Sequence, residues 1–132
     1  MKEKLFFATD VHGSEVCWRK FINSGPHYGA SILILGGDMT GKAVVPIIDD
    51  GGGRYHYSMQ DIRHDFEGDT ALAKETRNIR DHGYYAVTMT TDERDEYAND
   101  PNKFDELFHS QMRKTVADWV EWADAKLAGT GM

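Results

Sequence analysis

Two short apolar segments, separated by a helical pattern, are the feature of this sequence that most restricts its fold. The first segment is Leu5–Ala8 and the second is Ile32–Leu35, while Glu15–Ser24 between them has the pattern of a helix. A strand, a helix and a strand within about 30 residues form a βαβ unit, whose strands are parallel and, as neighbours, lie about 4.8 Å apart. We therefore expect an α/β protein that begins with a short parallel sheet.

Side chains that can bind a metal ion follow both predicted strands. Asp10 and His12 come just after the first strand, and Asp38 follows Gly36 and Gly37 at the end of the second. Because the carboxyl ends of parallel strands lie at one edge of a sheet, where open α/β sheets bind ligands, these side chains should converge. Two carboxylates and an imidazole suit a divalent ion such as manganese, iron or zinc. We expect Asp10, His12 and Asp38 to be metal ligands.

Each of these residues also has an explanation that needs no metal ion. Asp10 or Ser14 is a suitable cap for the helix that follows, and Gly36–Asp38 is a suitable tight turn. A histidine beside a glycine, as in His12-Gly13, is most often a surface loop residue. The metal hypothesis therefore depends on all three side chains meeting at one place.

A rival motif overlaps the second of these loops. Gly36–Lys42 has the spacing Gly-x4-Gly-Lys of a phosphate-binding P-loop. A P-loop continues with a Ser or Thr that binds magnesium, and it leads into a helix. Here Ala43 follows, and then Val44–Ile48, a β-branched run with a proline that predicts an edge strand. The P-loop interpretation is therefore disfavoured, and Lys42 is either a phosphate contact or an ordinary loop lysine.

The two metal-binding motifs together resemble the start of the calcineurin-like metallophosphoesterases. Members of that family begin with a strand that ends in Asp-x-His, followed by a helix and a second strand that ends in Gly-Asp. The matching stretches here are Phe6–Gly13 and Leu33–Asp38, and the resemblance covers residues 1–45. It implies that the chain is the N-terminal part of a metallophosphoesterase α/β sandwich.

The same resemblance implies a chemistry for the predicted ligands. Asp10 and His12 would hold a first metal ion, and Asp38 would bridge it to a second ion. A hydroxide activated by the two ions would then attack phosphorus in line. The implied substrate is a phosphorylated molecule, either a phosphomonoester or a phosphodiester.

The later motifs of the family do not follow in this sequence. Members also need Gly-Asn-His or Gly-Asn-Asp after a third strand, then a further histidine and Gly-His-x-His, but the chain has no Gly-Asn and no Gly-His dipeptide. We therefore expect an N-terminal fragment that is inactive by itself, with an active full-length parent. The alternative is a non-catalytic binding or oligomerisation module that keeps the fold without the site.

Residues 44–132 are expected to form a hairpin and a helix-rich insertion or cap, whereas residues 1–43 form the βαβ start of the phosphoesterase core. Asp49–Gly53 is a strong turn signal, so the hairpin should reverse there. Arg54 and His56, on its second strand, are either substrate contacts or ordinary strand-surface residues. The other elements expected are strands at residues 63–66 and 84–88 and helices that begin at Asp69 or Thr70, at Thr91 and at Pro101.

Charge and composition restrict the classes of binding partner that the chain is expected to have. The net charge of −7 comes wholly from residues 60–132, which carry nine basic and sixteen acidic side chains, against six of each in residues 1–59. No basic stripe is present, so general nucleic-acid binding is not expected. The apolar runs are too short for a membrane span. An uncovered edge and face of the short parallel sheet predict self-association of the fragment, and the alternative is a monomer in which the long C-terminal helix folds over that edge.

The single cysteine indicates the redox state of the cellular compartment in which the protein is expected. Cys17 has no partner for an intrachain disulfide, and its place beside apolar neighbours on the first helix predicts a small core residue. Absence of disulfides favours a reducing compartment, and we expect a cytoplasmic location.

Overall fold

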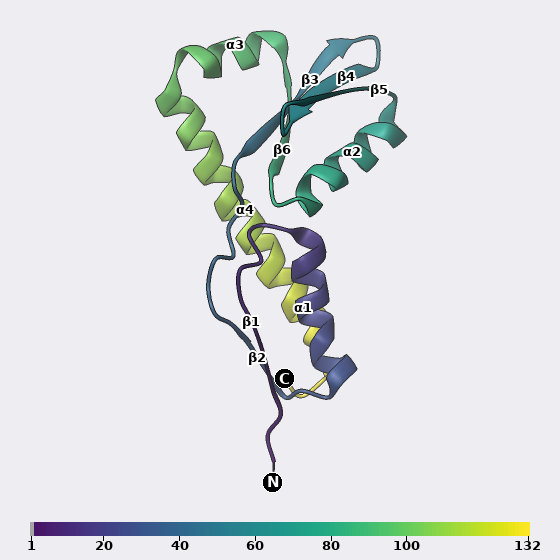
Figure 1. Cartoon of the computed structure of the whole chain (residues 1–132), viewed down its shortest axis with the longest axis vertical. Helices are drawn as coiled ribbons and strands as arrows, with labels where there is room; N and C mark the ends of the chain where they lie inside the picture. The colour runs from purple at the N-terminus through teal and green to yellow at the C-terminus, as the bar shows by residue number, and fades with distance from the viewer. Residues whose placement is uncertain (1) are drawn as a thin grey trace.

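The computed structural model describes residues 2–132 as a mixed α/β protein (Figure 1). Its strands form two separate sheets, a two-stranded sheet β1–β2 and a four-stranded sheet in the order β5–β4–β3–β6. The predicted α/β class is confirmed, while the phosphoesterase sandwich stays a prediction. The elements are β1 (Leu5–Ala8), α1 (Glu15–Tyr28), β2 (Ile32–Leu35), β3 (Val44–Gly51), β4 (Arg54–Met59), β5 (Ile62–Glu67), α2 (Asp69–Asp81), β6 (Tyr85–Thr90), α3 (Thr91–Asn99) and α4 (Pro101–Leu127).

The two-stranded sheet is the predicted parallel pair. Its register runs from Leu5 opposite Ile32 to Ala8 opposite Leu35, so the expected βαβ arrangement of β1, α1 and β2 is confirmed. Alternate residues of both strands are half-buried against α1, and the residues between them are exposed. Ser14 caps α1, because its side chain accepts the Cys17 N–H at 3.3 Å. One of the two capping alternatives is thus resolved in favour of Ser14.

The four-stranded sheet contains the larger core. β3 and β4 form the predicted antiparallel hairpin, β5 continues it, and β6 pairs with the other side of β3 in parallel. Val45 and Ile47 on one face pack with Ile79 of α2. The opposite face of β3 and β6 contacts α3 and α4. The predicted helix starts at Asp69, Thr91 and Pro101 are confirmed.

The prediction that β3 is an edge strand is wrong. β3 lies inside the sheet, between β4 and β6. Its antiparallel register with β4 includes only residues from Ile48 to Gly51, whereas Pro46 lies opposite Val87 of β6. A proline lacks the N–H that a strand with two full neighbours requires. Pro46 is tolerated because β4 does not pair with β3 at that level. The strand that follows Lys42, in place of a helix, also excludes the P-loop interpretation.

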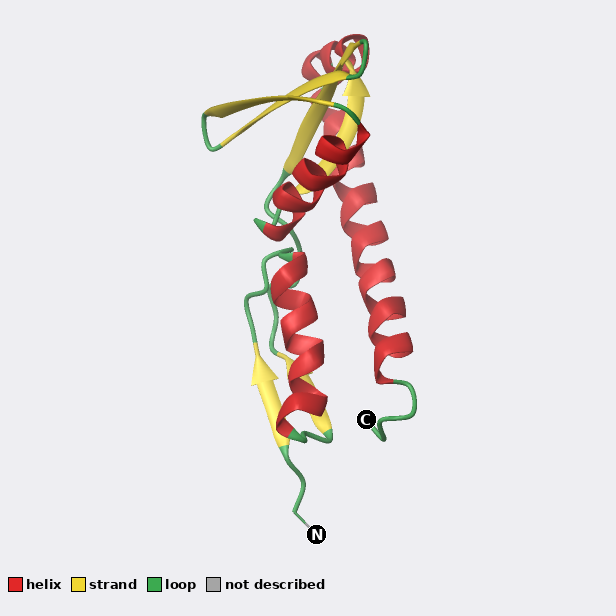
Figure 2. Ribbon diagram, turned by 90° about the vertical axis from the view of Figure 1, so that its right-hand side faces the viewer, coloured by secondary structure: helices red, strands yellow, loops and turns green. Residues whose placement is uncertain are grey.

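Helix α4 runs alongside both sheets (Figure 2). Near its start, Phe108 packs against Tyr85 of β6, with ring centroids 5.8 Å apart. Near its end, Trp119 stacks on Trp18 of α1, with ring centroids 5.2 Å apart. The end of the 44–132 region therefore completes the core of the 1–43 region, and Trp119 is a packing residue with Trp122 packed beside the same core.

Cys17 is not the core residue that we expected. It is exposed, whereas the neighbouring Trp18 is buried. Successive residues of a helix point about 100° apart, so only one of the two can face α4. None of the helices in residues 2–132 combines the length and the apolar composition that a bilayer crossing requires.

Candidate metal centre

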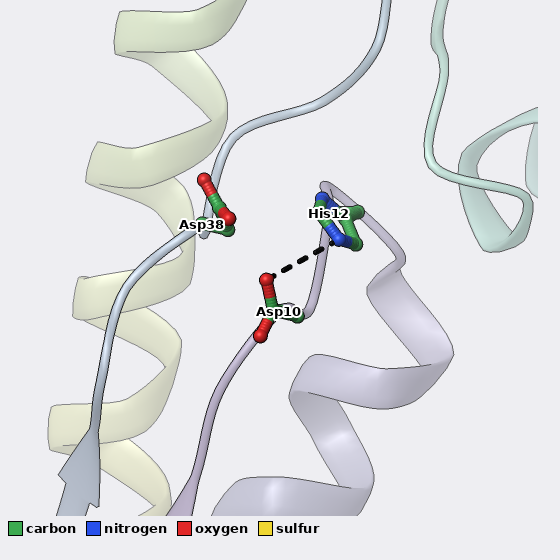
Figure 3. A group of neighbouring side chains, drawn as sticks. All are labelled: Asp10, His12 and Asp38. Atoms are coloured by element: carbon green, nitrogen blue, oxygen red, sulfur yellow. Dashed lines mark ion pairs between the residues drawn. The ribbon is translucent and has the colours of Figure 1, made fainter.

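The structure brings the three predicted ligands together. Asp10 and His12 lie on the loop between β1 and α1, and Asp38 lies on the loop between β2 and β3. One ligand atom from each side chain lies within 4.8 Å of the other two (Figure 3). His12 Nε2 is 3.5 Å from Asp10 Oδ1. The predicted convergence at the carboxyl edge of the parallel sheet is therefore present.

Backbone hydrogen bonds hold the two ligand loops side by side. The Asp10 N–H donates to Gly37 O at 3.1 Å, and the His12 N–H donates to Asp38 O at 2.8 Å. The Gly13 N–H donates to Met39 O at 3.0 Å. These bonds continue the pairing of β1 with β2 beyond the ends of the strands. These bonds hold the two loops side by side, and the exposed side chains of the three candidate ligands extend from them.

All three ligands have a left-handed backbone. The φ angles are 61° at Asp10, 51° at His12 and 49° at Asp38. Such a conformation costs about 1–2 kcal/mol for a residue with a side chain, although aspartate tolerates it better than most. Elsewhere in the described residues, side-chain-bearing residues adopt it only at Gln60 and Asp61, in the turn between β4 and β5. Strained residues that also carry ligand atoms are typical of functional sites.

The three candidate ligands are open to solvent. The side chains of His12 and Asp10 are 52% and 50% exposed. Two carboxylates and an imidazole can bind one divalent ion, and water can complete its coordination shell at so open a site. The donor set therefore fits one ion of the manganese, iron or zinc type. Within residues 2–132 this group has three members, so a second ion would have Asp38 alone from this chain.

Lys42, a predicted substrate contact, lies on the β2–β3 loop, and its side chain points to the turn after α2. Its Nζ donates to His82 O at 3.2 Å, and the same nitrogen lies 5.3 Å from the centre of the Tyr84 ring. A lysine engaged in this way supports the local packing. A role in phosphate binding stays a prediction, because it requires Lys42 to leave these contacts.

Arg54 and His56, the other predicted contacts, are not brought to the ligand loops. Arg54 pairs with Gly51 at the end of β3, roughly 20 Å along the strand from Val44, at a rise of about 3.3 Å per residue. His56 Nδ1 lies 2.6 Å from Asp50 Oδ2. Both residues are thus on the hairpin end that lies away from the loops (Figure 1).

Sequence reasoning missed one segment that touches both ligand loops. Gly83 predicts the end of α2, which the structure confirms, since α2 ends at Asp81 and Gly83 has a φ of 86°. The turn around Gly83 also receives hydrogen bonds from Ser14 and Lys42. No local pattern in the sequence indicates this contact, because the segments are far apart along the chain.

Comparisons with protein-family models, with curated proteins and with solved structures found no match to this chain. The resemblance to the metallophosphoesterases therefore rests on the residues of the two motifs. The case for a metal site rests on the geometry of the two loops.

Proposed function

We propose that Asp10, His12 and Asp38 bind one divalent metal ion, and that they form the N-terminal part of a metal-dependent phosphoesterase site. The observation that carries this proposal is the convergence of their three ligand atoms within 4.8 Å of one another. The left-handed backbone of all three residues supports it. The order of the motifs along the chain supports the phosphoesterase assignment.

Each residue has a distinct role in this proposal. Asp10 and His12 hold the ion from one loop, and Asp38 supplies the carboxylate from the other loop. A bound ion of this kind polarises a phosphoryl oxygen and lowers the pKa of water. A two-metal reaction needs more ligands than these three, so we expect the chain by itself to bind metal and to hydrolyse phosphoesters little or not at all.

A binding experiment with a matched control tests the metal site. We expect Asp10→Asn to weaken manganese binding at least about tenfold, because it removes a charged ligand. Asp61→Asn is the control, since Asp61 is also exposed and also has a φ of 61°. Isothermal titration calorimetry of both variants measures the difference. Equal affinities of the two variants, or an unchanged protein that binds no manganese at millimolar concentration, would contradict the proposal.

The outward face of the β1–β2 sheet favours a second candidate function, an oligomerisation module. Phe7 is 58% exposed and Leu5 is 52% exposed, and the two outward residues of β2 join them. Parallel sheets are usually covered on both faces. We propose that a second copy of the chain covers this face, which predicts self-association at micromolar concentration.

A further inference from the structure

The candidate metal site lies against the segment that connects α2 to β6, the 81–85 turn. This turn belongs to the region that the sequence assigns to an insertion or cap. It contacts the β1–α1 loop, which carries Asp10 and His12, and also the β2–β3 loop, which carries Asp38. It is therefore placed to influence the distance between the two sets of ligands.

Hydrogen bonds join the turn to the β2–β3 loop. The Lys42 N–H donates to Gly83 O at 2.9 Å, and the Tyr85 N–H donates to Ala43 O at 2.9 Å. The Gly41 N–H donates to the Tyr85 hydroxyl at 2.7 Å. Burial raises the pKa of the Tyr85 hydroxyl, because it disfavours the charged form. The end of the β2–β3 loop is thus fixed on the turn.

The turn also contacts the β1–α1 loop. Ser14 Oγ donates to Asp81 O at 2.8 Å, and Ser14 is buried. A Cβ atom at Gly83 would lie 2.3 Å from His12 O, which is far inside contact distance. The backbone of Gly83 therefore touches the backbone of a metal ligand, and only glycine allows this approach.

The two ligand loops meet each other at glycines beside the same turn. A Cβ atom at Gly13 would lie 2.3 Å from Gly41 Cα and 3.2 Å from Gly83 O. A Cβ atom at Gly41 would lie 3.0 Å from Gly83 O and 2.8 Å from the Tyr85 ring. These close approaches keep the loops from moving closer together, and the hydrogen bonds of the turn to both loops oppose their moving apart.

We propose that the 81–85 turn positions the candidate metal site by fixing the distance between its two ligand loops. Gly83 and Tyr85 are positioning residues in this account, because they act on the ion only through the backbones of His12 and Gly41. This inference rests on the proposed metal function, since a positioning role needs an ion to position. The effect of the 81–85 turn on the two loops can be measured without metal.

A pair of glycine variants tests the role of Gly83. Gly83→Ala places a methyl group against His12 O, whereas Gly51→Ala meets nothing within 4 Å, and the two glycines have nearly equal φ angles of 86° and 87°. Both variants place a side chain at nearly the same positive φ, so a difference between them reports mainly the contact with His12. We expect amide hydrogen exchange of His12 and Gly13 in the metal-free protein to be about tenfold faster in Gly83→Ala than in Gly51→Ala.

Tyr85→Phe tests the same inference if Gly83→Ala does not fold. It keeps the ring and removes only the oxygen that accepts the Gly41 N–H. Tyr57→Phe is its control, because Tyr57 is also buried and its hydroxyl is bonded to Glu75 of α2, away from the two loops. We expect faster exchange of the Gly41 and His12 amides in Tyr85→Phe alone, and manganese affinity lower by about tenfold.

The outcomes separate this inference from the proposed function. Exchange at His12 that is the same in Gly83→Ala and Gly51→Ala, or the same in Tyr85→Phe and Tyr57→Phe, would overturn the positioning role. Faster exchange in Gly83→Ala or Tyr85→Phe, together with no manganese binding by the unchanged protein, would support the link between the turn and the loops and would refute the metal function. Faster exchange together with weaker manganese binding supports both.

Discussion

The two sheets of this protein contain similar apolar strand residues but are covered to different extents. In the four-stranded sheet, Ile47 is completely buried against α2, and α3 and α4 contact the other face. In the β1–β2 sheet, α1 covers one face, and Phe7 and Ile34 on the other face are 58% and 39% exposed. The best-buried core and the candidate metal ligands thus belong to different sheets, and the 81–85 turn joins them.

This difference has a thermodynamic meaning. A fully buried aliphatic side chain contributes about 1.5–3 kcal/mol to folding, and a half-exposed one contributes much less. The left-handed residues of the two loops cost about 1–2 kcal/mol each. They follow the strands of the β1–β2 sheet, which has less buried apolar surface to offset that cost. The four-stranded sheet has to provide most of the stability, and the smaller sheet depends on α4 and on the turn for support.

The largest expected effect compares one residue type in the two sheets. Ile47→Ala should lower the free energy of unfolding by about 2–5 kcal/mol, because it leaves a cavity in a closed core. Ile34→Ala should lower it by about 1 kcal/mol or less, because Ile34 already faces solvent. Urea denaturation followed by circular dichroism measures both values. Equal losses would show that the two sheets are equally well covered in solution.

A smaller effect is expected on the proposed pairing of chains through the β1–β2 sheet. Phe7→Lys should weaken self-association at least about tenfold, because it puts a charge on the apolar face. Ile62→Lys is the control, since Ile62 is 59% exposed on the other sheet. Sedimentation velocity at micromolar protein distinguishes the species. A single 15.0 kDa species in the unchanged protein would contradict the pairing.

The smallest effect concerns alkaline stability of the larger core. Burial and the hydrogen bond to Glu75 raise the pKa of Tyr57 to about 12 from 10.0. The folded protein therefore holds this proton more tightly than the unfolded chain, and the stability gained is present below pH 10 and is lost as the pH rises towards 12. Tyr57→Phe should flatten that decline in the unfolding free energy. A decline of unchanged slope would show that Tyr57 does not cause it.

Local signals in the sequence were enough to predict much of the fold and the convergence of the three candidate ligands. Apolar runs predict β1 and β2, and the order of strand, helix and strand predicts their parallel pairing. Asp100 and Pro101 predict the start of α4, where Asp100 accepts the Lys103 N–H at 3.2 Å. Asp10, His12 and Asp38 converge because parallel strands end at one edge.

Features that depend on contacts between distant segments were not predicted. Pro46 indicates an edge strand only if β4 pairs along the whole of β3, which it does not. Cys17 is exposed because Trp18, its neighbour, takes the position that faces α4. The contact of Gly83 with His12 joins residues far apart in the chain, and nothing in the local sequence of either one indicates it.

The central claim is that the two loops bind a divalent metal ion through Asp10, His12 and Asp38. Anomalous diffraction from crystals grown with manganese, with data collected on both sides of the metal absorption edge, tests it most directly. We expect one anomalous peak within bonding distance of a carboxylate oxygen of Asp10, an imidazole nitrogen of His12 and a carboxylate oxygen of Asp38. Ordered crystals with no peak among these side chains, or with a peak bound only by other residues, would contradict the account.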